Sequence, residues 1–170
     1  MLKWFCPDLV LDSIYDLDLE LLKKRGIKGI ITDLDNTLVA WNDYTLEGPL
    51  KDWFKALRDS NIKICILSNS TSSKVADFAA KLGIPAVTKA VKPRRGGFRQ
   101  SLLQMGLKAE ETAVLGDQLF TDILGGNRTG LFTIWVKPIS QNEFYGTKIT
   151  RFFEKRLIKV LKSKGFIKTN

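Results

Sequence analysis

Two carboxylates stand two positions apart in the stretch KGIITDLDNTL, residues 28–38. Asp33 ends an apolar run, and Asp35 follows it after a single leucine. A lone Asp is common where a strand turns, because its side chain bonds to the turn backbone. Two carboxylates this close repel each other, and the repulsion favours a proton on one of them. The pair could therefore combine an ionised nucleophile with a protonated general acid.

Polar side chains of the same kind follow other apolar runs. In chain order they are Ser68 and Asn69 after IKICIL, Lys92 after AVTKA, and Asp117 and Asp122 after TAVLG. One such residue is ordinary turn chemistry, but acid, hydroxyl, lysine and acid in succession are hard to explain that way. Ligands of open parallel α/β sheets bind beyond the carboxyl ends of the strands. We therefore expect these side chains to meet at one edge of a sheet.

Five short runs rich in Val, Ile, Leu and Thr predict the buried strands of such a sheet. They span residues 28–33, 62–67, 86–90, 112–117 and 131–136. Amphipathic segments with helix-capping residues lie between them, at 49–60, 72–83, 96–106 and 121–130. The alternation predicts an α/β fold, a doubly wound three-layer sandwich around a central, mainly parallel, five-stranded sheet. Residues 1–27 read as an N-terminal extension with a short helix at 17–26.

The motifs DLDNTL, LSNS, VKP and GDQLFTD, in this order, resemble the four motifs of the haloacid-dehalogenase superfamily of aspartate-nucleophile phosphatases. The resemblance covers roughly residues 28–136, and its first and fourth motifs look like subfamily IIIA. The opening residues 4–41 look like the YqeG-type phosphatases, which are similar to mitochondrial phosphatidylglycerophosphate phosphatases. The resemblance implies a phosphomonoester hydrolase that works through an aspartyl-phosphate intermediate.

Asp33 would be the nucleophile of that reaction, because it lies at a strand end. Asp35 would protonate the leaving oxygen and then accept a proton from the attacking water. The negative charge beside Asp35 favours the protonated form that this role needs. Thr37 could orient Asp35 by a hydrogen bond.

The remaining groups would hold the phosphoryl group. Ser68 and the amides near Asn69 could bind its oxygens, and Lys92 would supply positive charge to the transition state. Asp122 could hold Lys92 or belong to the outer shell of a metal ion. An acid favoured by the N-terminus of a helix is a compatible alternative for Asp122.

A cation must separate the carboxylate nucleophile from the anionic substrate. Mg²⁺ prefers oxygen ligands and keeps several waters, so one or two carboxylates are enough to bind it. The candidate ligands are Asp33 and Asp117, and the family resemblance implies the backbone carbonyl of Asp35 as another. Mg²⁺ is therefore the predicted cofactor.

Composition excludes several other kinds of site. The chain has no histidine, which excludes His-based zinc sites and Ser-His-Asp triads. Cys6 and Cys65 lack metal-type spacing, so we expect a reducing, cytoplasmic environment without a disulfide framework. No apolar run approaches the ~18 residues that span a bilayer, and no secretory signal is recognisable.

The spacing of the motifs leaves no room for a cap domain over the site. The segment between Thr37 and Pro49 is long enough for a flap, and residues 68–92 hold one helix and one strand. Trp41 lies where the flap would overhang the substrate, although packing within the flap is an alternative. An open site suits a large substrate. Alternatively, a second copy of the chain in a homo-oligomer could cover it.

Residues 148–170, which follow the expected phosphatase domain of residues 1–147, carry eight basic residues against the single acid Glu154. Their apolar periodicity predicts an amphipathic helix that could lie on an anionic membrane, at the inner membrane face. Packing on the domain or in a dimer, and contact with nucleic acid, remain alternatives. We expect no DNA binding, and the tail lacks aromatic platforms for single strands.

The resemblance and the tail together favour phosphatidylglycerophosphate as the substrate. A soluble sugar phosphate, a nucleotide or a phosphoprotein remains open. An RNA- or ribosome-associated binding protein built on the same scaffold is the alternative of a different class.

Overall fold

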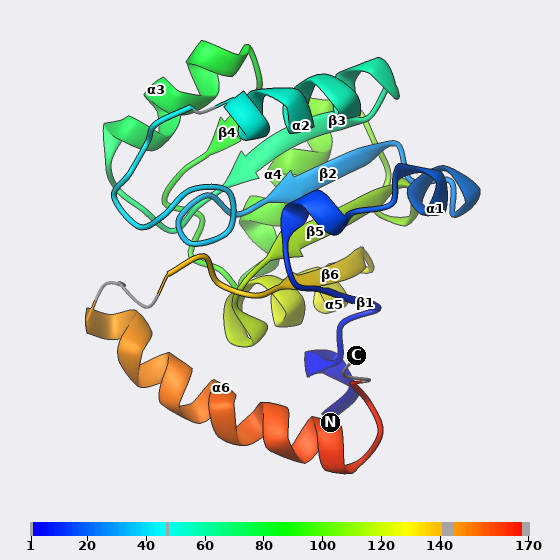
Figure 1. Ribbon diagram of the computed structural model, residues 1–170, viewed down its shortest axis with the longest axis vertical. Helices are drawn as coiled ribbons and strands as arrows, with labels where there is room; N and C mark the ends of the chain where they lie inside the picture. The colour runs from blue at the N-terminus through cyan, green and yellow to red at the C-terminus, as the bar shows by residue number, and fades with distance from the viewer. Residues whose placement is uncertain (1, 47, 141–144, 168–170) are drawn as a thin grey trace.

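The computed structural model describes residues 2–46, 48–140 and 145–167, and it describes residues 145–149 and 151 by their backbone alone. The described residues form one six-stranded sheet (Figure 1). Its strands are β1 (Leu9–Leu11), β2 (Gly29–Thr32), β3 (Lys63–Leu67), β4 (Ala86–Val87), β5 (Thr112–Gly116) and β6 (Phe132–Val136). Their order is β1-β6-β5-β2-β3-β4, and all neighbouring pairs are parallel.

The direction of winding reverses between β2 and β5. From β2 the chain adds β3 and β4 on one side, and β5 and β6 follow on the other. The carboxyl ends of strands at such a reversal leave a crevice in which ligands bind. Asp33 follows β2 and Asp117 follows β5, so the sheet brings both carboxylates to this position.

Helices cover both faces of the sheet, as the amphipathic segments predict. They are α1 (Leu19–Lys24), α2 (Gly48–Asp59), α3 (Ser73–Leu82), α4 (Arg95–Met105), α5 (Leu124–Thr129) and α6 (Tyr145–Ser163). Ile30 of β2 packs in one core cluster with Phe54 of α2 and Phe78 of α3. The neighbouring Ile31 packs in a second cluster with Phe98 of α4, because successive strand side chains point to opposite faces.

The α/β three-layer fold is confirmed, with differences at the margins. The five predicted strands are present, and β1 adds a sixth at the edge beside β6. Strand β4 is shorter than predicted, because Lys89 and Val91 adopt left-handed backbone conformations (φ 52° and 56°). The helix predicted at 121–130 begins instead as a π-helical turn, η4 (Leu119–Ile123), that leads into α5.

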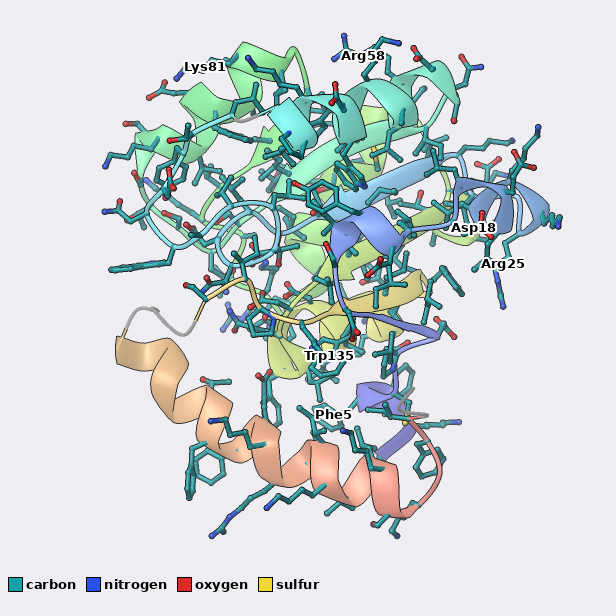
Figure 2. The ribbon with its side chains drawn as sticks, viewed as in Figure 1. Phe5, Asp18, Arg25, Arg58, Lys81 and Trp135 are labelled. Carbon is teal, nitrogen blue, oxygen red and sulfur yellow. The ribbon has the colours of Figure 1, made fainter. Side chains whose placement is uncertain are left out.

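Helix α6 lies outside the three layers, along the edge formed by β6 and β1 (Figure 1). Its Leu161 is buried in a third apolar cluster with Leu119, Ile123 and Trp135. Figure 2 shows Trp135 and Phe5 between the sheet and α6. The inner side of the predicted basic helix therefore packs on the domain. Within the described ranges, no helix combines the length and the apolar composition needed to cross a membrane.

Candidate active site

The chain turns sharply after β2 and presents its first two acids there. The backbone N–H of Asp33 still bonds to the Leu115 carbonyl of β5, at 3.0 Å, so Asp33 is fixed to the sheet. The N–H groups of Leu38 and Val39 then return to the carbonyl of Leu34, at 2.9 and 3.2 Å. This single turn leaves Asp33 buried at the strand end and places Asp35 on the rim beyond it.

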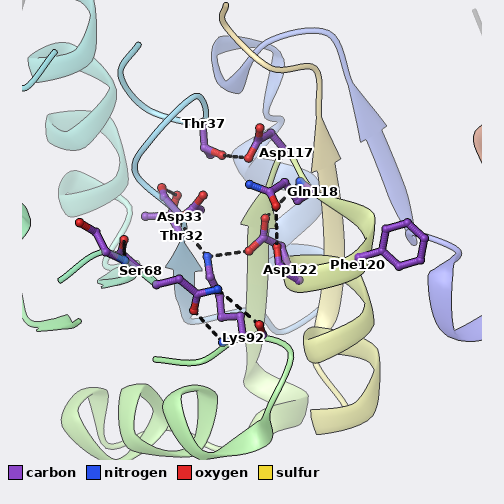
Figure 3. Close-up of polar contacts among 12 residues, drawn as sticks. Thr32, Asp33, Thr37, Ser68, Lys92, Asp117, Gln118, Phe120 and Asp122 are labelled. Carbon is purple, nitrogen blue, oxygen red and sulfur yellow. Dashed lines mark hydrogen bonds and ion pairs between the residues drawn. The ribbon is translucent and has the colours of Figure 1, made fainter. Parts of the chain in front are cut away.

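The side chain of Asp35 is held by the flap that follows the turn. Its Oδ1 accepts a hydrogen bond from the Tyr44 hydroxyl at 3.3 Å and from the backbone N–H of Asn42 at 3.4 Å. The predicted hydrogen bond from Thr37 to Asp35 is wrong. The Thr37 hydroxyl instead donates to Asp117 Oδ1 at 3.0 Å, because the turn directs Thr37 toward β5 (Figure 3).

Lys92 lies at the centre of the site and is buried. Its Nζ is 2.9 Å from Asp33 Oδ1 and 2.7 Å from Asp122 Oδ1 (Figure 3). Burial alone would lower the pKa of Lys92, but Asp122 and Asp33 outweigh it and hold that pKa above its ordinary value. Lys92 is therefore a fixed positive charge that touches the predicted nucleophile.

Asn69 contacts the backbone of Lys92 through both ends of its amide. Asn69 Oδ1 accepts from the Lys92 N–H at 2.7 Å, and Asn69 Nδ2 donates to the Lys92 carbonyl at 3.3 Å. The prediction made Asn69 a substrate-binding residue. Its side chain also borders the pocket, but these contacts make it a residue that positions the lysine.

Asp122 comes from the π-helical turn η4, a feature that often occurs at functional sites. Its Oδ2 accepts a hydrogen bond from the Gln118 N–H at 3.1 Å, while its Oδ1 meets Lys92. Gly116 permits this close approach, because a Cβ there would lie 2.4 Å from Asp122 Cγ. The geometry agrees with the predicted role of Asp122 in holding Lys92.

Ser68 begins a series of turns that leads from β3 to α3. Its buried Oγ accepts from the Ser70 N–H at 3.0 Å, Ser70 Oγ accepts from Ser72 N–H, and Ser72 caps α3. Ser68 Oγ acts only as an acceptor in this series, so its hydroxyl proton is available to a ligand in the pocket.

The carboxylates of the site could bind a divalent cation. Asp33, Asp117 and Asp122 offer oxygens that all lie within 4.8 Å of one another. Burial raises the pKa of Asp33 to about 7, Lys92 opposes the rise, and Asp122 and Asp117 add to it. A cation would relieve this excess of carboxylate over ammonium groups. Asp33 and Asp117 are the predicted direct ligands, and Asp122, which accepts hydrogen bonds from Lys92 and the Gln118 N–H, would belong to the outer shell.

A pocket of about 570 Å³ opens above these groups. Four predicted catalytic residues face it: Asp33, Asp35, Ser68 and Lys92. Trp41 and Tyr44 of the flap line one part of the wall, and Gln118, Thr121 and Thr150 line another. The last three residues were not among the predicted site residues. Gln118 and Thr121 lie inside the fourth motif, which could have identified them, whereas nothing in the tail pointed to Thr150.

Comparison with known proteins identifies the family. Residues 2–139 match the sequence model of the mitochondrial PGP phosphatases. The chain belongs to this PGP phosphatase family. "Probable phosphatase YqeG" of Bacillus subtilis is 43% identical over 165 residues, which are 97% of this chain and 96% of that protein. The family resemblance read from the motifs is thereby confirmed.

Two eukaryotic members of the PGP phosphatase family are more distant. "Phosphatidylglycerophosphate phosphatase 1, chloroplastic/mitochondrial" of Arabidopsis thaliana is 30% identical over 83% of this chain and 43% of its own length. "Phosphatidylglycerophosphatase GEP4, mitochondrial" of Saccharomyces cerevisiae is 30% identical over 77% of each chain. The chain is thus a phosphatase of the YqeG-like group of haloacid-dehalogenase subfamily III.

Solved structures agree with the fold of the PGP phosphatase family. The cobalt-bound deoxy-D-mannose-octulosonate 8-phosphate phosphatase of Haemophilus influenzae superposes with a TM-score of 0.52 at 23% identity. The superposition covers 67% of this chain and 70% of that one. A subfamily IIIA hydrolase of Legionella pneumophila gives a TM-score of 0.50 at 24% identity, covering 68% of each chain.

Proposed function

We propose that the protein is an Mg²⁺-dependent phosphomonoesterase with Asp33 as its nucleophile. The observation that carries the proposal is the buried contact of Asp33 with Lys92, beside Asp117 and beneath an open pocket. Mg²⁺ held by Asp33, Asp117 and the Asp35 carbonyl would screen the charge of the substrate phosphate and fix its orientation. Side chains of the protein supply the nucleophile, the general acid and base, and the groups that bind the phosphoryl oxygens.

The first step transfers the phosphoryl group to Asp33. A carboxylate oxygen of Asp33 attacks phosphorus and forms an O–P bond, while the bond from phosphorus to the leaving oxygen breaks. Asp35 gives its proton to that oxygen, so the product leaves as a neutral alcohol. The Ser68 hydroxyl donates to a phosphoryl oxygen, and Lys92 offsets the negative charge that gathers around phosphorus.

The second step releases inorganic phosphate. A water molecule attacks the phosphorus of the aspartyl phosphate, and Asp35, now ionised, accepts its proton. The bond between phosphorus and the Asp33 oxygen breaks, which restores the carboxylate. Lys92 remains bound to Asp122 throughout, so the ammonium group keeps its place while the charge of Asp33 changes.

Phosphatidylglycerophosphate is the proposed substrate. The family model and the relatives from Arabidopsis and yeast support it, since their names state that activity. The pocket is open to solvent, which suits a bulky lipid, and the exposed Trp41 of the short flap lines it. The outer face of α6 would hold the enzyme at an anionic membrane that contains this lipid.

A soluble sugar phosphate is the second candidate. "Glyceraldehyde 3-phosphate phosphatase" of Pyrococcus furiosus is 30% identical over 117 residues, which are 68% of this chain and 38% of that protein. The open pocket is also compatible with so small a substrate. A direct comparison of the two phosphates separates these possibilities.

The test is a phosphate-release assay with three substrates: a short-chain phosphatidylglycerophosphate, glyceraldehyde 3-phosphate and p-nitrophenyl phosphate. We expect Mg²⁺-dependent release that EDTA abolishes, with the highest kcat/KM for the lipid. Asp33→Asn should lower kcat at least ~10³-fold on all three, since the nucleophile is lost. Retained activity in Asp33→Asn would overturn the mechanism, and a higher kcat/KM for glyceraldehyde 3-phosphate would overturn the lipid assignment.

A further inference from the structure

The flap reaches back to Asp35, two residues beyond the proposed nucleophile. Within the described residues, the side chain of Asp35 bonds to two groups of the flap, the Tyr44 hydroxyl and the Asn42 N–H. Both bonds end on the same oxygen, Oδ1. Asp35 itself lines the pocket, and none of the hydrogen bonds among the described residues ends on its other oxygen, Oδ2.

Tyr44 is well placed to act as a fixed support. Its ring packs against the main core cluster, so the position of its hydroxyl is set by the core rather than by the flap alone. Lys74 of α3 adds a second attachment. Its Nζ donates to Asn42 Oδ1 at 3.3 Å and lies 5.8 Å from the centre of the Tyr44 ring. The flap is thus held between the core and α3 while it contacts Asp35.

We propose that Tyr44 is a positioning residue that directs the acidic proton of Asp35 to the leaving oxygen, an inference that rests on the proposed function. A carboxyl oxygen that accepts two hydrogen bonds has its lone pairs engaged, so the proton is favoured on the other oxygen. Tyr44 and the Asn42 N–H therefore select Oδ2 as the acid. They also fix the carboxyl plane, which decides where that proton points.

The dependence of rate on the leaving group is the readout that a merely structural role would not move. An alkoxide leaves only with the help of an acid, whereas p-nitrophenolate leaves readily without one. Because kcat/KM covers the steps up to departure of the leaving group, it isolates this effect. Tyr44→Phe keeps the ring and its packing and removes only the hydroxyl.

The experiment measures kcat/KM of Tyr44→Phe on glycerol 3-phosphate or the short-chain lipid, and on p-nitrophenyl phosphate. We expect a loss of about 10-fold on the alkyl phosphate and less than about 2-fold on the aryl phosphate, part of the 10²–10⁴-fold that general acids contribute. Tyr15→Phe is the matched control, because Tyr15 is exposed and lies outside the lining of this pocket. Equal losses on both substrates would overturn the proposal.

A double-mutant cycle completes the test. In an Asp35→Asn background, Tyr44→Phe should leave kcat/KM for the alkyl phosphate unchanged, because the proton that Tyr44 directs is gone. A further 10-fold loss in that background would show that Tyr44 acts independently of Asp35 and would overturn the proposal. Retained activity in Asp33→Asn would instead remove the proposed function itself, so the two failures are distinguishable.

Discussion

Asp33 faces opposite demands on its charge. A nucleophile must be ionised, yet burial raises the pKa of Asp33 to about 7, and the neighbouring Asp122 and Asp117 add to the rise. Lys92 opposes the rise from 2.9 Å, but it is shared with Asp122 at 2.7 Å. One ammonium group therefore serves two carboxylates, with Asp117 close by. A cation at this position would complete the balance and keep Asp33 ionised at neutral pH.

The excess of carboxylates over ammonium groups around Asp33 should make the stability of the metal-free protein depend on pH. The pKa of Asp33 is raised from its ordinary value of 3.8 to about 7, so the folded state binds the proton more tightly than the unfolded state. The free-energy cost of ionising Asp33 in the folded state is absent below about pH 4. It grows as the pH rises and reaches its full value above about pH 7. In EDTA, the unfolding free energy of the wild type should fall relative to Asp33→Asn between pH 5 and 7, by up to about 1.4 kcal/mol per pH unit.

Urea unfolding of both proteins at several pH values measures this difference. Mg²⁺ should flatten the pH dependence of the wild type, since a bound cation favours the ionised carboxylate. A difference between wild type and Asp33→Asn that does not change with pH would contradict the prediction.

The π-helical turn η4 joins the catalytic site to the C-terminal helix. Asp122 at one side of the turn meets Lys92, and Phe120 at the other side faces α6 and the N-terminus. The Phe120 N–H donates to Oε1 of the buried Glu154 at 3.1 Å. Glu154, the single acid of the basic tail, therefore stabilises η4, because it accepts a backbone hydrogen bond at the N-terminal end of this helical turn.

Replacement of Glu154 tests that connection. Glu154→Leu places a side chain of similar size against η4 but leaves the Phe120 N–H without its acceptor. The loss should lower the unfolding free energy by about 1–3 kcal/mol. Glu154→Gln is the matched control, because its amide oxygen can still accept. Thermal or urea unfolding measures both. A Glu154→Leu protein as stable as Glu154→Gln would show that η4 does not depend on this contact.

The sequence predicted the central sheet because β2, β3, β5 and β6 are buried on both faces and read as continuous apolar runs. Strand β1 was not predicted, because its three residues are only half buried and do not form a continuous apolar run of the usual length. Among the described strands it pairs only with β6, at the edge of the sheet. The chemical identities of Asp33, Lys92 and Asp117 could be read from their order. The partners of Thr37 and Asn69 could not, since these depend on where β5 and the Lys92 loop lie in space.

The two sides of α6 differ, which explains why its apolar periodicity was compatible both with packing on the domain and with binding to a membrane. Glu154, Leu157 and Leu161 lie on one side of the helix and pack on the domain. Phe152 and Phe153 are 56% and 55% exposed, and basic residues accompany them on the outer side. The exposed basic residues of α6 whose side chains are described are Lys155, Arg156, Lys159 and Lys162. Thr150 lies on the inner side, in line with Glu154, and lines the pocket, so the first turns of α6 lie beside the site.

Binding to vesicles decides whether the outer side of α6 contacts a membrane. Each Lys or Arg near an anionic surface contributes about 1 kcal/mol, so the double variant Lys155→Glu/Lys159→Glu should weaken binding to phosphatidylglycerol vesicles by at least about 10-fold. Phe152→Ser/Phe153→Ser should weaken it by the loss of apolar insertion. These surface changes are preferable to removing α6, which would uncover Leu119 and Trp135.

The matched control is Arg58→Glu/Lys81→Glu, since both residues lie at the end of the molecule opposite α6 (Figure 2). We expect this control to bind anionic vesicles about as tightly as the wild type, and the binding of both to weaken with salt, because the charges are exposed. All variants should hydrolyse a soluble phosphomonoester at the wild-type rate, since none changes the pocket. Equal loss of binding in the control would mean that net charge, rather than the outer side of α6, draws the protein to the membrane. Undiminished binding in the two α6 variants would exclude the helix as the contact.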